Sequence, residues 1–148
     1  MSLVIGAKRG VARGVARAVV AGFATLSVPA LGDTLPPGIS AWFSTMQTQA
    51  LVLEGGVLRV AFKKPLVTPE LFAHQIKSLC QAPLVGQRYE WGNARIERIE
   101  ILNDIGQQGW ALPGGRAACR KLNGMNDAEA VAYIERERRE VRAGRVQD

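Results

Sequence analysis

The spacing of apolar positions along the chain changes between that of helices and that of strands, which predicts a mixed domain. A first helix with one buried face is predicted from apolar side chains at i, i+3, i+4 and i+7: Ile39, Trp42, Phe43 and Met46. Two apolar runs follow at residues 50–53 and 57–62. Within the second run, large apolar side chains stand at every other position, as they do in a half-buried strand. Because Gly55 and Gly56 between the runs suit a tight turn, we predict a β-hairpin.

A second helix is predicted from Thr68 to about Gln81. Thr68 supplies a capping hydroxyl, Pro69 suits the first helical position, and Glu70 places an acid in the first turn. Pro83 disfavours a helical conformation in the residue before it, so the helix is expected to end before Pro83. The apolar face of this helix consists of Leu71, Phe72, Ile76, Leu79 and Cys80.

Two further strands are predicted at residues 95–102 and 108–112, with a turn at 103–106 between them. The first of the two also admits a helical interpretation. Pro113-Gly114-Gly115 ends the second strand, and a short helix is predicted at 116–122.

A last helix is predicted to begin at Asn126, because Glu129 three residues later completes a capping box. We expect its first half to bury three side chains: Ala130, Val131 and Ile134. The helix is expected to continue through 135–142, where Glu135 and Arg139 stand at i, i+4.

The predicted order is α-ββ-α-ββ-α-α, which indicates an α+β fold. We expect a small antiparallel sheet of about four strands in ββ-α-ββ order, with the helices on one face. The chain has 148 residues, of which 47% are hydrophobic and 22% charged, and residues 33–148 suffice for one small domain.

The positive charge of the chain is concentrated at its N-terminal end. The net charge is +6, from 19 basic and 13 acidic residues. Four of the basic residues precede residue 33, namely Lys8, Arg9, Arg13 and Arg17, whereas every acid lies at or after Asp33. The remainder therefore carries 15 basic and 13 acidic residues, a net charge of +2. This balance argues against a nucleic-acid partner.

Residues 1–32 have the pattern of a cleavable signal peptide. A basic, acid-free segment at 1–17 precedes an uncharged segment at 18–31, which is too short to span a bilayer. Small residues allow cleavage after Gly32 or after Ala30. We therefore expect a protein of the periplasm or the secreted fraction, with no transmembrane segment once the signal is removed. A mitochondrial transit peptide, an uncleaved anchor and an intracellular or organellar protein with a basic leader are the alternatives.

Cys80 and Cys119 are the only cysteines of the chain. Export to an oxidising compartment would favour a disulfide between them. The alternative is a pair of buried free thiols that behave as small apolar side chains.

The sequence shows no catalytic constellation, no metal-ligand spacing and no cofactor motif. His74 is the only histidine, and Ser78 follows it at i+4 on the same helix. A small exported hydrolase that uses His74 is one alternative function, although no neighbouring residue supplies the third group that a catalytic base needs. Glu97 and Glu100 stand three apart on a predicted strand, so they are expected on opposite faces and make a poor acid–base pair.

Aromatic side chains near glycines are the best candidates for recognition. Tyr89, Trp91 and Trp110 lie in or beside glycine-bearing loops. Arg116 is near these aromatic residues in the sequence and could bind an acidic group of a partner. The alternative is that these aromatic residues cover the core. The sequence favours a non-enzymatic, exported binding or accessory protein, held by one disulfide, whose partner is a protein or another envelope component.

Overall fold

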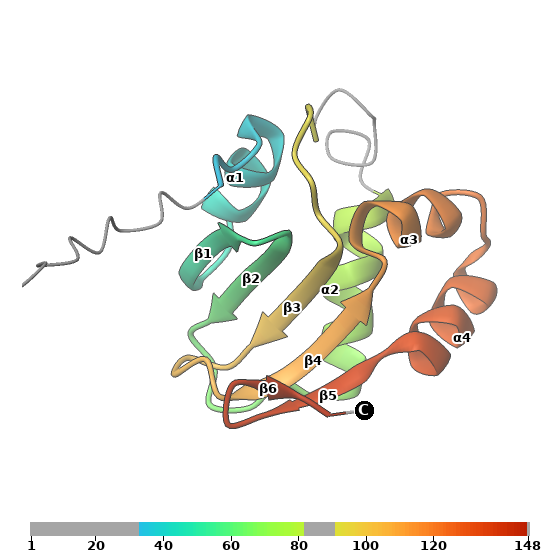
Figure 1. Ribbon diagram of the computed structural model, residues 1–148. Helices are drawn as coiled ribbons and strands as arrows, with labels where there is room; N and C mark the ends of the chain where they lie inside the picture. The colour runs from blue at the N-terminus through green and yellow to red at the C-terminus, as the bar shows by residue number, and fades with distance from the viewer. Residues whose placement is uncertain (1–32, 82–90, 148) are drawn as a thin grey trace, which may run out of the picture. The chain divides into compact units, whose positions relative to one another are not determined.

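The computed structural model describes residues 33–81 and 91–147, which belong to one compact unit (Figure 1). The predicted signal peptide at 1–32 and the candidate residue Tyr89 lie outside the described residues. The elements follow one another as α1 (Pro37–Ser44), β1 (Thr48–Glu54), β2 (Val57–Phe62), α2 (Pro69–Gln81), β3 (Arg98–Leu102), β4 (Gln108–Pro113), α3 (Gly115–Leu122), α4 (Asp127–Glu137), β5 (Arg139–Arg142) and β6 (Arg145–Val146).

The strands form a single mixed sheet in the order β1-β2-β3-β4-β5-β6. All neighbouring pairs are antiparallel except β2 and β3, which are parallel. This exception arises because α2 connects β2 to β3, and a crossover of this kind returns the chain in the same direction. The α+β class is confirmed, whereas the predictions of a wholly antiparallel sheet and of about four strands were wrong.

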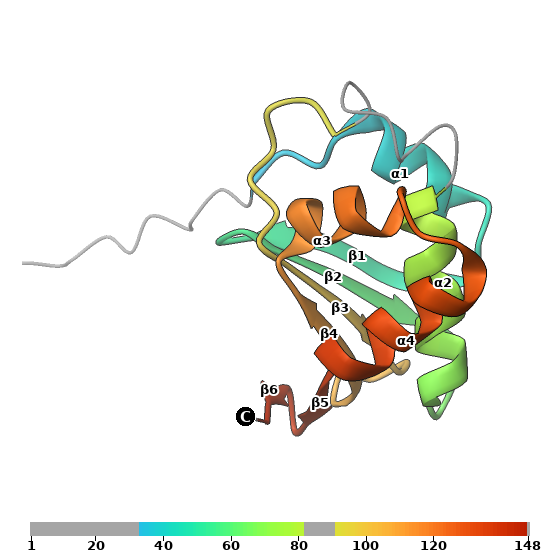
Figure 2. The ribbon, with the colours of Figure 1, turned by 90° about the vertical axis from the view of Figure 1, so that its right-hand side faces the viewer.

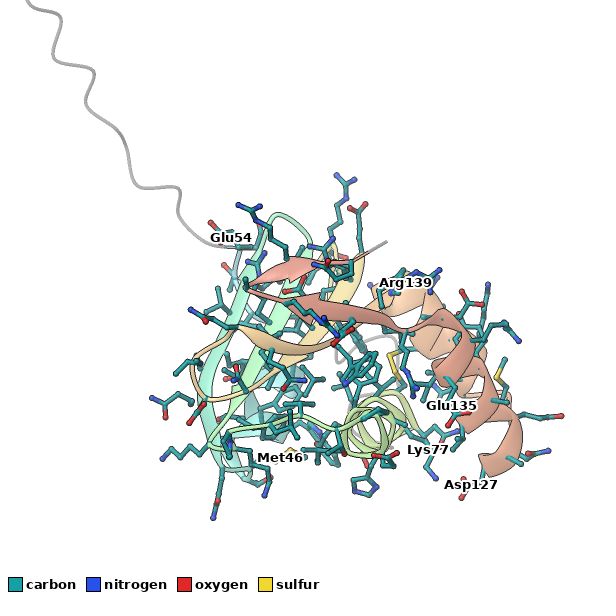
Figure 3. The ribbon with its side chains drawn as sticks, turned by 90° about the horizontal axis from the view of Figure 1, so that it is seen from below. Met46, Glu54, Lys77, Asp127, Glu135 and Arg139 are labelled. Atoms are coloured by element: carbon teal, nitrogen blue, oxygen red, sulfur yellow. A yellow bond between two sulfur atoms is a disulfide. The ribbon has the colours of Figure 1, made fainter. Side chains whose placement is uncertain are left out.

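The four helices contribute to one core on one face of the sheet, as Figure 2 shows for α2, α3 and α4. Alternate strand positions point into this core: Leu53, Leu58, Val60, Ile99, Ile101 and Leu112. The helices supply Ile39 and Phe43 from α1, Phe72 and Ile76 from α2, Leu122 from α3 and Ile134 from α4. Lys77 of α2 also pairs with Asp127 of α4 across 3.0 Å, and the two side chains point toward each other in Figure 3.

The opposite face of the sheet carries a second, smaller cluster that includes part of β5. Ala61, Leu102, Ala111 and Val141 are buried there, with Val146 of β6 packed against them.

Residues 135–142 were predicted as helix, but α4 ends at Glu137 and Arg138 takes an extended conformation (φ −62°, ψ 147°). Arg142 then pairs with Glu140, two residues away, as neighbours in a strand do rather than at helical spacing.

The predicted starts of α2 and α4 are confirmed by their hydrogen bonds. The Thr68 hydroxyl accepts from the backbone N–H of Leu71 at 3.2 Å. Hydrogen bonds from the Glu70 backbone N–H and from the Thr68 hydroxyl lower the pKa of the Glu70 carboxyl below its usual value. In α4, Asn126 and Glu129 form the reciprocal bonds of a capping box, both 3.0 Å long.

The buried face of α4 differs from the prediction at one position. Ala130, Tyr133 and Ile134 are buried, whereas Val131 is 37% exposed. Residues three or four apart share one face of a helix, as Ala130, Tyr133 and Ile134 do. Val131 directly follows Ala130, so it points away from this buried face.

The predicted disulfide between Cys80 and Cys119 is present. It joins the last turn of α2 to the middle of α3, with 4.6 Å between the two Cα atoms. Both cysteines are buried in the main core, so the bond ties two helices together beneath the surface.

Candidate binding groove

A groove of about 480 Å³ lies where the first described residues meet the segment before β3. Its lining comes from three places in the chain: residues 33–37, Leu53 of β1 and residues 91–95. A neighbouring hollow of about 300 Å³ shares Asp33 and Arg95 with it and extends to Gly55, Gly56 and Glu97. We refer to the two together as the Asp33–Arg95 groove.

Backbone hydrogen bonds hold the walls of this groove in place. The Gly56 carbonyl, in the turn between β1 and β2, accepts from the N–H groups of Glu97 and Arg98 at 2.7 and 3.2 Å. The Arg116 backbone N–H, at the start of α3, donates to the Ile96 carbonyl at 3.0 Å. The β1–β2 turn and α3 therefore fix the segment that leads into β3.

The groove presents both charge signs above an apolar floor. Arg95 and Glu97 form an ion pair, in which Arg95 Nε lies 2.8 Å from Glu97 Oε1, and both side chains are more than half exposed. Asp33 is also exposed, while Leu53 and Trp91, which line the same groove, are buried.

One of the predicted recognition residues, Trp91, lines this groove, and a second, Arg116, contacts the lining residue Gly92. Trp91 is only 2% exposed and belongs to the main core, so it shapes the floor of the groove instead of offering a free ring. Arg116 Nη1 donates to the Gly92 carbonyl at 2.9 Å, which fixes the loop directly after Trp91. Both residues thus contribute to the groove through its architecture.

The third described residue of the predicted set, Trp110, lies elsewhere and organises the loop before α2. Its Nε1 donates to the Val67 carbonyl at 3.0 Å. The side-chain amide of Gln108 binds the same residue twice, accepting from the Val67 N–H at 2.8 Å and donating to its carbonyl at 3.1 Å. Arg138 lies over the indole ring, 4.8 Å from its centre. These contacts give Trp110 a structural role.

We expect Trp110→Phe to lower the free energy of unfolding by about 1 kcal/mol, as the loss of one hydrogen bond does. The loss stays small because Gln108 continues to donate to the Val67 carbonyl. Urea denaturation measures the change. If Trp110 were instead a recognition residue held by no internal contact, the variant would unfold at the same urea concentration as the wild type.

Glu97 precedes β3 and Glu100 lies within it, and the two carboxylates have different partners. The Glu100 side chain is 4% exposed and accepts from Arg59 Nε at 3.0 Å and from Arg98 Nε at 2.8 Å. Two guanidinium groups therefore compensate one buried carboxylate on the face of the sheet opposite the helices.

His74 is exposed on α2 and makes no hydrogen bond or ion pair with a residue of the described ranges. Within those same ranges, no group of three or more His, Cys, Asp or Glu residues is arranged to hold a metal ion. In residues 33–81 and 91–147, no helix has both the length and the apolar character of a bilayer span.

Comparison of the chain with protein families, curated proteins and solved structures gives no match that shows a relationship. The properties of the groove therefore rest on this chain alone. Sequence reasoning missed Asp33 and Leu53 as lining residues, because neither carries a local signal and only the fold brings them beside residues 91–95.

Proposed function

We propose that the protein is an exported, non-enzymatic binding protein of the periplasm or the secreted fraction, whose protein partner occupies the Asp33–Arg95 groove. The observation that carries this proposal is the disulfide between Cys80 and Cys119 in the core. Disulfides persist in oxidising compartments and are rare in the cytosol, where thiols are kept reduced.

The arrangement of the N-terminal residues supports the same proposal. The sequence contains no acidic residue before Asp33, as expected for a leader that is removed at this point. Asp33 and Thr34 are exposed, whereas Pro36 is already buried. Cleavage after Ala30 or Gly32 would leave Pro36 and the buried residues that follow it in the mature chain.

The lining of the groove supports a role in binding. Its charged residues come from segments that are distant in the sequence, and the backbone bonds of Gly56 and Arg116 hold the segment that carries Arg95 and Glu97 before any partner arrives. A site whose geometry is fixed in advance loses less conformational entropy on binding.

The first experiment measures the intact mass of the protein from fractionated cells of its host, with and without reduction before alkylation. We expect a mass that corresponds to a start at Leu31 or Asp33, with both thiols protected until they are reduced. A full-length protein in the cytosolic fraction with two thiols free to alkylate would overturn export.

A second experiment tests the groove with a matched pair of arginine variants. Arg95→Ala removes a groove residue, whereas Arg145→Ala removes an exposed arginine of β6. We expect capture of the partner from envelope extracts to fall at least about tenfold for Arg95→Ala only. Equal capture by both variants would exclude the groove as the binding site while leaving export untouched.

A further inference from the structure

The two edges of the sheet differ in a way that points to a contact with another chain. β6, at one edge, has only two residues, of which Arg145 is charged. β1, at the other edge, runs for seven residues, and Glu54 at its end is the only charged one (Figure 1). Sheets normally protect their edges with short strands, charges or proline, because an open edge can pair with another strand. Within residues 33–81 and 91–147, a short or charged edge strand is found at the β6 edge and not at the β1 edge.

Residues 50–54 of β1 pair with β2 in a regular register and are partly exposed. The pairing of β1 with β2 is irregular between Thr48 and Ala50, and from Ala50 to Glu54 it continues without a shift. Within this regular stretch Val52 is 44% exposed, which makes it one of few large apolar side chains on the described surface. Val52 lies on the face of the sheet opposite the helices, next to Arg59 of β2.

We propose that the β1 strands of two copies of this chain pair in antiparallel fashion about a two-fold axis at Val52. In this register Val52 of one copy faces Val52 of the other, and Glu54 faces Ala50. Opposed residues in an antiparallel pair point to the same face, so both sheets present their helices on one side of a continuous sheet.

A second copy is favoured over other occupants because the stretch 50–54 complements itself. The symmetric register covers two exposed Val52 side chains with each other and keeps the two Glu54 carboxylates apart at opposite ends. A parallel register would place Glu54 beside Glu54, where like charges oppose pairing. Each Glu54 also keeps its own counter-ion, because Arg59 of the same chain lies 3.5 Å away.

The test compares two substitutions of exposed valines in the full chain. Val52→Lys places two ammonium groups opposite each other at the two-fold axis, whereas Val131→Lys adds the same charge on α4, where the valine is 37% exposed. We expect analytical ultracentrifugation to give a dissociation constant of the dimer at least about tenfold higher for Val52→Lys. Val131→Lys and the conservative Val52→Ile are expected to keep the wild-type value.

Hydrogen exchange locates the contact. We expect amide protection in β1 to increase from micromolar to near-millimolar protein in the wild type, and to stay constant in Val52→Lys. A wild type that remains a monomer throughout would overturn the proposal. So would protection of β1 that does not depend on concentration, or that appears only when an extended peptide is added, because another segment would then occupy the edge.

Discussion

Gly115→Ala is expected to destabilise the fold by more than about 3 kcal/mol, because a side chain at this position has no space. A Cβ atom on Gly115 would lie 2.3 Å from the Ile96 carbonyl oxygen and 2.9 Å from the Glu97 carbonyl carbon. Neither backbone atom can move without displacing the segment that leads into β3. Gly115 also has a φ of +39°, a backbone angle that residues other than glycine rarely adopt.

Gly55→Ala separates the two causes, because Gly55 shares the unfavourable backbone angle but not the contact. Its φ is +55°, and a Cβ there would meet no atom within 4 Å. We expect this variant to lose only about 1 kcal/mol. Urea denaturation of both variants measures the difference. Similar losses would mean that backbone angle alone, and not the approach of α3 to Ile96, explains the need for glycine.

Removal of the disulfide is expected to lower the free energy of unfolding by about 4 kcal/mol, as the loop-entropy relation gives for a loop of about 40 residues. The sequence separation of the two cysteines is 39. A loss of this size approaches the whole net stability of many small domains, so the Cys80→Ala, Cys119→Ala double variant should be partly unfolded at physiological temperature. Thermal and urea denaturation of the double variant measure the loss.

Reduction of the wild-type protein is the matched control for this substitution, since it breaks the bond while keeping both sulfur atoms in the core. We expect reduction to produce most of the loss seen in the double variant. If the reduced protein stayed within about 1 kcal/mol of the oxidised one, the core packing of α2 and α3 alone would hold the helices together.

Much of the fold followed from local patterns. The β1–β2 hairpin was predicted because two apolar runs flank a glycine pair, and α2 and α4 were predicted to start at Thr68 and Asn126 because both residues cap a helix. The cysteine pairing was predicted because the chain contains only two cysteines and its leader indicates export to an oxidising compartment. In each case the deciding residues lie within a few positions of one another or have no competitor.

The C-terminal hairpin was missed because a local signal was misleading. Glu135 and Arg139 stand at helical spacing, yet β5 begins at Arg139, where it pairs with the free edge of β4. A competing signal was present in the sequence, since Val141 and Val146 flank the Ala143-Gly144 turn. The energy that selects the strand comes from burying Val141 against Leu102 and Ala111, which are distant in the sequence.

The candidate site could be predicted only in outline. The glycine-bearing loop around Trp91 was identified, and Arg116 was added as a basic residue nearby in the sequence that could receive an acidic group. That Trp91 lies in the core, and that Trp110 anchors Val67, depends on which strand adjoins which. Indole side chains at loop ends serve cores and surfaces equally well, so their sequence context does not distinguish the two.

The sequence by itself determined the helix starts, the first hairpin and the cysteine pair, because capping, turn geometry and the count of cysteines act over short distances or without alternatives. The tertiary structure alone decided the parallel contact of β2 with β3, the addition of β5 and β6, and the placement of Asp33 and Arg95 along one groove. These features depend on contacts between side chains that are far apart in the chain. A local pattern shows that a side chain will be buried but does not specify which distant residue will bury it.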